Sequence, residues 1–261
     1  MQNEQKTVGI GVQDFSKLRE ENLFYIDKTA FIKEWWENQD TVTLITRPRR
    51  FGKTLNMSMV ENFFSIQSKA EENLFTGLEI WKEEKYWELH GKYPVIFLSF
   101  ASVKGDTYSD VREGIVQTIL DLYAKYDYLR QSDALKEKAY FDYVNGEMSN
   151  TIAAMALRRL SLCMSLYYGK KVLILLDEYD TPLQEAYVKG YWNELTSFMS
   201  SLFNYTFKTN PYMERGLLTG ITRVSKESIF SDLNNLEIVT TTSNKYSTSF
   251  GFTEEEVRNA L

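Results

Sequence analysis

One short stretch of this sequence combines the residue types that bind phosphate. Residues 41–54 read TVTLITRPRRFGKT, an apolar run and then a loop that ends in Gly52, Lys53 and Thr54. Glycine lets the backbone approach a phosphate, the lysine can reach the β and γ oxygens, and the threonine hydroxyl can ligate Mg²⁺. The following residues have helical spacing, and a helix N-terminus favours an anion. We therefore interpret the stretch as a nucleotide-phosphate loop.

The loop departs from the general pattern G-x-x-x-x-G-K-S/T. Arginine stands at position 47, where that pattern has glycine, and the rest of the loop is unusually basic. A basic turn before a helix is therefore the alternative interpretation. If the loop binds a nucleotide, we expect the contacts to come from Arg47, Pro48, Arg49, Arg50, Phe51, Gly52, Lys53, Thr54 and Leu55.

A second stretch supplies carboxylates where such a loop would need them. Residues 172–180 read VLILLDEYD, and the five apolar residues predict a strand buried on both faces, as in a parallel sheet. Ligands of open α/β sheets bind beyond the carboxyl ends of the strands, which is where Asp177 and Glu178 emerge. Asp177 would hold Mg²⁺, and Glu178 would orient or deprotonate the attacking water. A solvated turn explains the acids alone, but both motifs together favour Walker A and Walker B.

Further polar residues follow predicted strands. The strand at residues 215–221 precedes Thr222 and Arg223. The threonine could bind the attacking water and the arginine could meet phosphate charge, although a strand-end hydroxyl and a surface arginine explain them equally. Asp180 could reach the metal's water shell, but the Thr-Pro that follows it also suits the start of a helix.

Alternating strands and helices position these residues. Such alternation predicts an α/β fold with a mainly parallel sheet flanked by helices. The predicted strands include residues 94–100, 172–176, 215–221 and 236–242, and the predicted helices include residues 29–37, 55–64, 150–168, 191–207 and 254–261.

Residues 1–40 form a lead-in to the loop. Their expected role is packing against the sheet edge. Phe24, Tyr25 and Asp27 are weaker candidates for contacts with a nucleotide base, because segments just before a P-loop strand often lie near the base.

Composition excludes several other classes. A chain of 261 residues with 43% hydrophobic residues suits one large α/β domain. The single Cys163 lies in an apolar helical run, and the single His90 lies in a polar turn. The sequence therefore lacks the residues for a His-based zinc site or a Ser-His-Asp triad. A net charge of −6 argues against a broad nucleic-acid face. No apolar leader or bilayer-length run is present, so we expect a cytoplasmic protein without membrane contact.

Five segments together resemble the bacterial AAA-ATPase-like family of predicted P-loop NTPases. They are FSKLREENLFYIDKT, TRPRRFGKT, VLILLDEYDTPL, LTGITRVSKESIFSDLNNL and FGFTEEEV, and the likeness extends along nearly the whole chain. In that family the arginine-rich loop is the usual form of Walker A.

The resemblance implies a three-layer, additional-strand P-loop ATPase with strand order 5-1-4-3-2 over residues 1–261. It implies ATP and Mg²⁺ as ligands, held by Gly52, Lys53, Thr54, Asp177 and Glu178. Family members commonly continue into a helical region, which would begin near residues 253–261, and into a domain resembling PD-(D/E)XK nucleases. The expected partner is therefore such a C-terminal region or a second copy of the chain, with nucleic acid bound only through that region.

Two functional classes stay open. The first is a Mg²⁺-dependent ATPase that drives or gates a conformational change in a larger protein. The second is a nucleotide-gated interaction module with negligible turnover. Glu178 favours the ATPase, because a module that only binds needs no carboxylate at the water position. The altered loop favours the module, and a role in guiding a fused nuclease rests on analogy alone.

Overall fold

In the part of the chain that the structure describes, five strands form one sheet in the order β2-β3-β4-β1-β5, which confirms the expected α/β fold and the order 5-1-4-3-2. The computed structural model describes residues 6–68, 72–132, 148–222, 229–230 and 233–260. The strands are β1 (Val42–Thr46), β2 (Val95–Ser99), β3 (Val172–Asp177), β4 (Met213–Gly220) and β5 (Leu236–Val239).

The chain divides into two units. The sheet unit comprises Asp40–Thr46 and Pro94–Ile238, and the loop unit comprises Met1–Gln39, Arg47–Tyr93 and Val239–Leu261. The single domain expected over residues 1–261 stays a prediction.

Parallel pairing in the sheet unit brings several strand ends to one edge. β1 pairs with β4, β4 with β3, and β3 with β2, all in parallel. Ile45 lies opposite Thr219, and Ser99 lies opposite Asp177. The carboxyl ends of these four strands therefore share the edge where open α/β sheets place their ligands.

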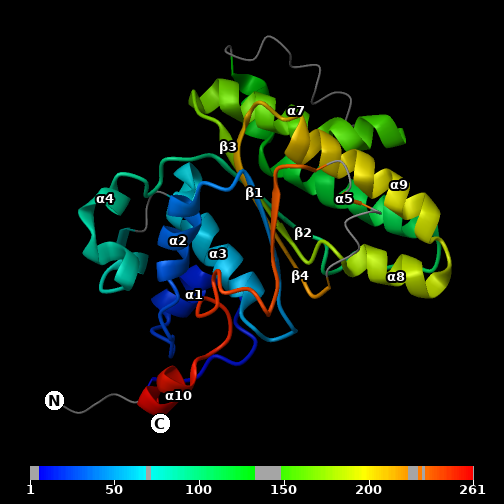
Figure 1. Ribbon diagram of the computed structural model, residues 1–261. Helices are drawn as coiled ribbons and strands as arrows, with labels where there is room; N and C mark the ends of the chain where they lie inside the picture. Colours follow the sequence, from blue (N-terminus) through cyan, green and yellow to red (C-terminus); the bar gives the residue numbers. More distant parts are fainter. Residues whose placement is uncertain (1–5, 69–71, 133–147, 223–228, 231–232, 261) are drawn as a thin grey trace. The chain divides into compact units, whose positions relative to one another are not determined.

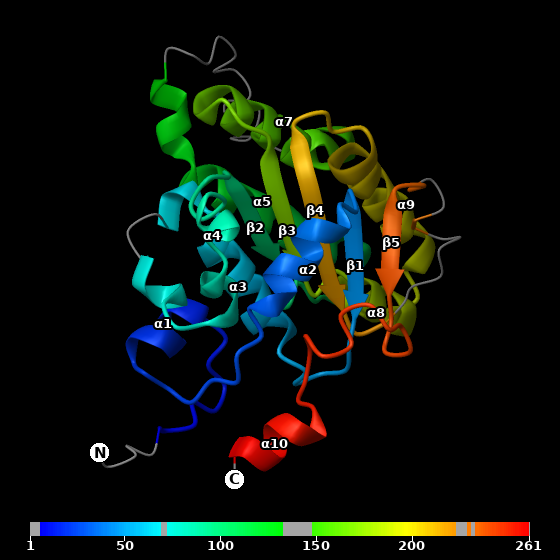
Figure 2. The same ribbon diagram turned by 60° about the vertical axis from the view of Figure 1, so that its left-hand side comes forward.

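Helices cover a face of this sheet. Figures 1 and 2 show α5, α7 and α9 packed on one side of it. Alternate strand residues such as Val42, Ile96 and Ile174 join helix residues such as Ile115 and Leu160 in one buried apolar cluster. The helical segments of this unit are α5 (Tyr108–Lys125), η4 (Asp127–Gln131), α7 (Asn150–Tyr168), α8 (Thr181–Lys189), α9 (Trp192–Phe203) and η5 (Asn204–Lys208).

The loop unit has an aromatic core. The rings of Phe15, Phe63 and Phe75 pack with centroid distances of 5.1 Å between Phe15 and Phe75 and between Phe63 and Phe75. His90, expected in a polar turn, is buried and packs edge-on against these aromatics. The helical segments are α1 (Phe15–Glu20), α2 (Ala30–Asn38), α3 (Lys53–Phe64), η1 (Ile66–Ser68), η2 (Glu72–Phe75), η3 (Glu79–Lys82), α4 (Glu84–Trp87) and α10 (Glu254–Ala260).

One predicted strand ends earlier than expected. The strand at residues 236–242 stops at Val239, because the Thr240 N–H donates to the Ser243 hydroxyl at 3.0 Å and the chain turns. The helix predicted at residues 191–207 is confirmed, and it changes from the α-helix α9 to the π-helical segment η5 after Phe203. Sequence periodicity predicts neither the turn nor the change of helix type.

Candidate functional site

The predicted phosphate loop runs from the end of β1 to the first residue of α3. Gly52 precedes the helix with φ of +76°, a left-handed conformation that favours glycine. Arg50 also has a left-handed backbone, with φ of +68°. The N-cap residue Gly52 has no side chain to cap α3, and the first N–H groups of any helix lack partners within it, so this end suits an anion.

Lys53 lies across the loop that it follows. Its ammonium group donates hydrogen bonds to the main-chain carbonyls of Arg47 and Pro48, each at 3.2 Å. The side chain is buried, with 4% of the residue exposed. The loop thus curves around the ammonium group of Lys53.

Arg47 has a different environment from the other loop arginines. Its buried guanidinium donates to the carbonyls of Val239 and Tyr246 at 3.3 and 3.4 Å and lies over the Phe250 ring. Burial lowers its pKa below the ordinary arginine value. Arg47, which replaces the glycine of the general pattern, therefore joins the loop to residues 239–250.

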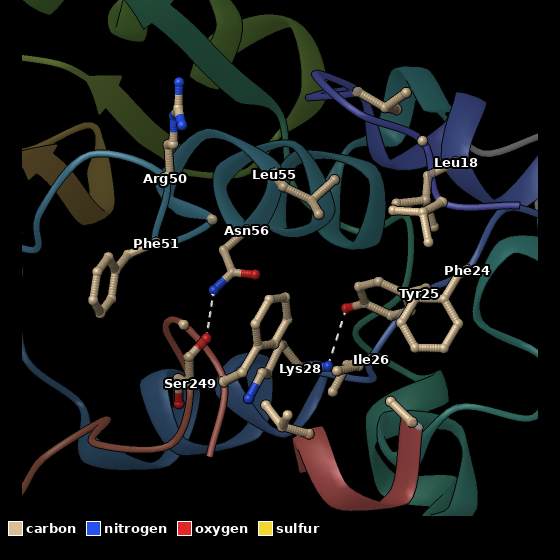
Figure 3. Close-up of a pocket in the computed structure, with 18 residues that line it drawn as sticks. Leu18, Phe24, Tyr25, Ile26, Lys28, Arg50, Phe51, Leu55, Asn56 and Ser249 are labelled. Carbon is tan, nitrogen blue, oxygen red and sulfur yellow. Dashed lines mark hydrogen bonds between the residues drawn. The ribbon is translucent and has the colours of Figure 1, made fainter. Parts of the chain in front are cut away.

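Arg49 and Arg50 are exposed, and within the described part of the chain neither side chain forms a hydrogen bond or ion pair. Figure 3 shows the Arg50 side chain pointing away from Asn56. Pro48 and Phe51 are exposed, and the Phe51 carbonyl accepts a hydrogen bond from the Gly251 N–H at 3.0 Å. Gly251 has φ of +74°, and a Cβ there would lie 2.9 Å from the Phe51 ring.

A cavity of about 370 Å³ adjoins the loop within the same unit (Figure 3). Gly52, Leu55 and Asn56 line it from the loop and α3, and Phe24 and Tyr25 line it from the lead-in. Its lining is mostly apolar, and burial raises the pKa of the Tyr25 hydroxyl well above its ordinary value. A largely apolar cavity with a few fixed polar groups is the usual form of a small-molecule site.

Asp27, grouped with Phe24 and Tyr25 in the sequence, faces other partners. Its carboxylate accepts from the N–H and hydroxyl of Thr29 and from the Glu79 N–H. It therefore has a structural role at the start of α2, and it is not among the residues that line the cavity.

An ion pair anchors α10 beside the cavity. Lys28 donates to both carboxylate oxygens of Glu256 at 2.6 and 2.7 Å, and the Thr253 N–H donates to Glu256 at 2.7 Å. The Glu256 N–H donates to the Thr253 hydroxyl, which completes a capping box at the start of α10. Burial raises the pKa of Glu256, but the hydrogen bonds from Lys28 and Thr253 outweigh it and bring the pKa below the ordinary value.

We expect Glu256→Gln to lower the free energy of unfolding by about 1–2 kcal/mol at neutral pH, because Lys28 loses its charged partner. A carboxylate with a lowered pKa stabilises the fold above its unfolded-state pKa, and this contribution disappears as the pH falls through the folded-state pKa. The free energies of unfolding of the wild type and the variant, measured with urea, should therefore become equal in acid. The exposed neighbour Glu255→Gln is the control, and an equal loss in that variant would contradict the assignment.

Carboxylates and hydroxyls gather at the strand ends of the sheet unit. Asp177 is buried and accepts a hydrogen bond from the Thr219 hydroxyl. Glu178 is half-buried with φ of +52°, an uncommon conformation for a residue other than glycine. Such backbone strain clusters at functional sites. The Thr222 hydroxyl donates to Asp180 at 2.6 Å.

The comparison with protein families gives one match that covers most of the chain. The family described as Predicted AAA-ATPase matches residues 9–230. The chain belongs to this AAA-ATPase-like family.

The chain is also similar to a curated bacterial protein. The chain is 29% identical over 254 residues to "Uncharacterized protein in vnfD 5'region" of Azotobacter chroococcum mcd 1. The aligned part is 97% of this chain and 44% of that protein, so the chain spans less than half the length of this relative.

The predicted site residues of this AAA-ATPase-like chain fall into two groups. Residues 47–55 lie in the loop unit, and Asp177, Glu178 and Thr222 lie together in the sheet unit. Arg223 lies outside the described residues. Sequence reasoning ranked Asp180 low, although this carboxylate is fully buried and has several donors. The Thr-Pro pair that follows Asp180 is typical of a helix start, and it therefore favours a structural role for Asp180.

Within the same described residues, no helix has the length and apolar composition needed to cross a membrane. They also hold no cluster of three or more His, Cys, Asp or Glu that could bind a metal ion.

Proposed function

We propose that this chain binds ATP with Mg²⁺ and hydrolyses it. The observation that carries the proposal is the position of Lys53, whose ammonium group is held on two loop carbonyls at the start of α3. A phosphate that enters the loop would meet this charge and the helix N-terminus together. Membership in a family of predicted AAA-ATPases supports the same conclusion.

The cavity beside the loop is the proposed site of the adenine base. It is continuous with Gly52, and aromatic side chains such as Phe24 offer the apolar contacts that a planar base requires. The lead-in would therefore bind the base while the loop binds the phosphates. This division of roles supports a nucleotide as the ligand, because inorganic phosphate alone needs no such cavity.

Thr54 and Asp177 are the proposed ligands of Mg²⁺, since hydroxyl and carboxylate oxygens are the hard ligands that this ion prefers. β1, from which the loop continues, ends at the same sheet edge as Asp177. Bound Mg²⁺ would supply neutralising charge for the phosphate oxygens. Glu178 would accept the proton of the attacking water, and its strained backbone supports a functional role.

The nucleotide-gated module remains the second candidate because of Arg47. This side chain joins the loop to residues 239–250, so a loop that changes shape on binding would act on that segment even without turnover. In either case we propose that the effect is passed to a C-terminal region or to a second copy of the chain. The greater length of the Azotobacter relative supports a larger whole protein.

Calorimetry with ATP, GTP and inorganic tripolyphosphate, each with Mg²⁺, tests this proposal together with an assay of phosphate release. We expect ATP to bind at least about tenfold more tightly than tripolyphosphate, because tripolyphosphate has no base to fill the cavity. Steady phosphate release supports the ATPase, and binding without release supports the module. Absence of ATP binding would overturn both. Specific activity across a protein-concentration series tests for completion of the site by a second copy.

A further inference from the structure

Asp180 has an unusual position for the residue that precedes a helix. It is the N-cap residue of α8, yet its side chain forms no capping bond to that helix. The carboxylate is fully buried and accepts from the N–H groups of Ile221 and Thr222 at 3.0 and 2.7 Å and from the Thr222 hydroxyl at 2.6 Å. Gln184 donates a further bond at 2.9 Å. The carboxylate therefore holds the residues that follow β4.

Other contacts join the same two segments of the sheet unit. The Tyr179 N–H donates to the Thr219 carbonyl at 3.0 Å, and the Tyr179 hydroxyl donates to the Thr222 carbonyl at 2.8 Å. A Cβ at Gly220 would lie 2.6 Å from the Tyr179 ring and 2.7 Å from an Asp180 oxygen, so only glycine permits this approach. Residues 177–180 and 219–222 thus form one closely packed group that contains Glu178.

The bond to Asp180 also determines what the Thr222 hydroxyl can do. A threonine hydroxyl has one hydrogen to donate and two lone pairs that accept. Its hydrogen is directed to Asp180, whose oxygen is already the acceptor for N–H donors. The Thr222 oxygen can therefore only accept from a further partner. A water that donates one hydrogen to Thr222 and the other to Glu178 would keep a lone pair for attack on phosphorus.

We propose that Asp180 is a positioning residue for hydrolysis, which holds Ile221 and Thr222 after β4 and fixes the Thr222 hydroxyl as an acceptor for the attacking water. The role rests on the proposed ATPase function and goes beyond the metal and base roles of Asp177 and Glu178. Asp180 itself touches neither nucleotide nor water in this scheme. Its effect on the rate passes through Thr222.

A double-mutant cycle with Asp180→Ala and Thr222→Val tests this role. Each single variant is expected to lower kcat about 10- to 100-fold with KM changed by less than about threefold, because only the transition state needs the oriented water. The double variant should be about as slow as the slower single variant, since both changes remove the same effect. Thr222→Ser, which keeps the hydroxyl, should restore most of the rate.

Gln184→Ala is the matched control, because it removes a bond to the same carboxylate without touching the loop after β4. Its kcat should equal that of the wild type. If the losses of kcat multiply in the double variant, the positioning role would be overturned. If they follow a fall in melting temperature in every variant, Asp180 would have a purely structural role. A wild-type chain that binds no ATP or releases no phosphate would instead overturn the ATPase proposal, and the positioning role with it.

Discussion

Replacement of Glu178 with glutamine is expected to lower ATP turnover by about two to four decades, the usual scale of general-base assistance. Glutamine keeps the shape of the side chain but cannot take a proton from water. Glu178 directly follows Asp177 at the end of β3, and its left-handed backbone turns the chain there. ATP affinity should change little, because the carboxylate acts on the water and not on the bound nucleotide.

Single-turnover phosphate release and calorimetry on the same preparations separate chemistry from binding. Glu194→Gln is a suitable control, because Glu194 is an exposed glutamate of α9 in the same unit. Turnover in the Glu178 variant equal to that of the wild type would assign this acid to structure. Loss of ATP binding along with turnover would instead point to a local change of fold.

The second large effect is expected at Lys53, where alanine should weaken ATP binding by about one to two decades. This corresponds to roughly 1.5–3 kcal/mol for a charge-assisted phosphate contact. The loss should be as large for ADP or GTP, because the ammonium group would contact phosphate and not the base. Calorimetry with each nucleotide measures it.

Lys53 also bonds two loop carbonyls, so circular dichroism and thermal unfolding must show that the variant is folded. Lys92→Ala, which removes an exposed lysine of the same unit, controls for the lost charge. Unchanged ATP affinity in a folded Lys53→Ala protein would refute the phosphate-loop interpretation.

Local patterns predicted the sheet well because a strand buried on both faces must be apolar along its length. Residues 172–176 are such a run, and all of β3 is buried. The order of the strands followed from family resemblance, since no local pattern encodes which strands are neighbours. The capping box at Thr253 and Glu256 is likewise a local pattern, because its partners are three residues apart.

Contacts between distant residues could not be predicted in this way. Arg47 bonds carbonyls of Val239 and Tyr246, almost two hundred residues away, so its sequence neighbours suggested only a basic loop. The partners of Asp180 likewise follow a different strand. Phe24 and Tyr25 line the cavity while Asp27 does not, a distinction that depends on side-chain direction and not on sequence spacing.

The contact between Phe51 and Gly251 has an evolutionary consequence. The two residues share a main-chain hydrogen bond, and the space that a side chain at 251 would need is filled by the ring of residue 51. A side chain at position 251 would therefore meet the ring of Phe51 in addition to a backbone conformation that favours glycine. Homologous chains that carry another residue at position 251 should also have a smaller one at position 51. The sequence signature of the proposed phosphate loop would then include a position outside any contiguous motif, which searches for residues 47–54 alone would overlook.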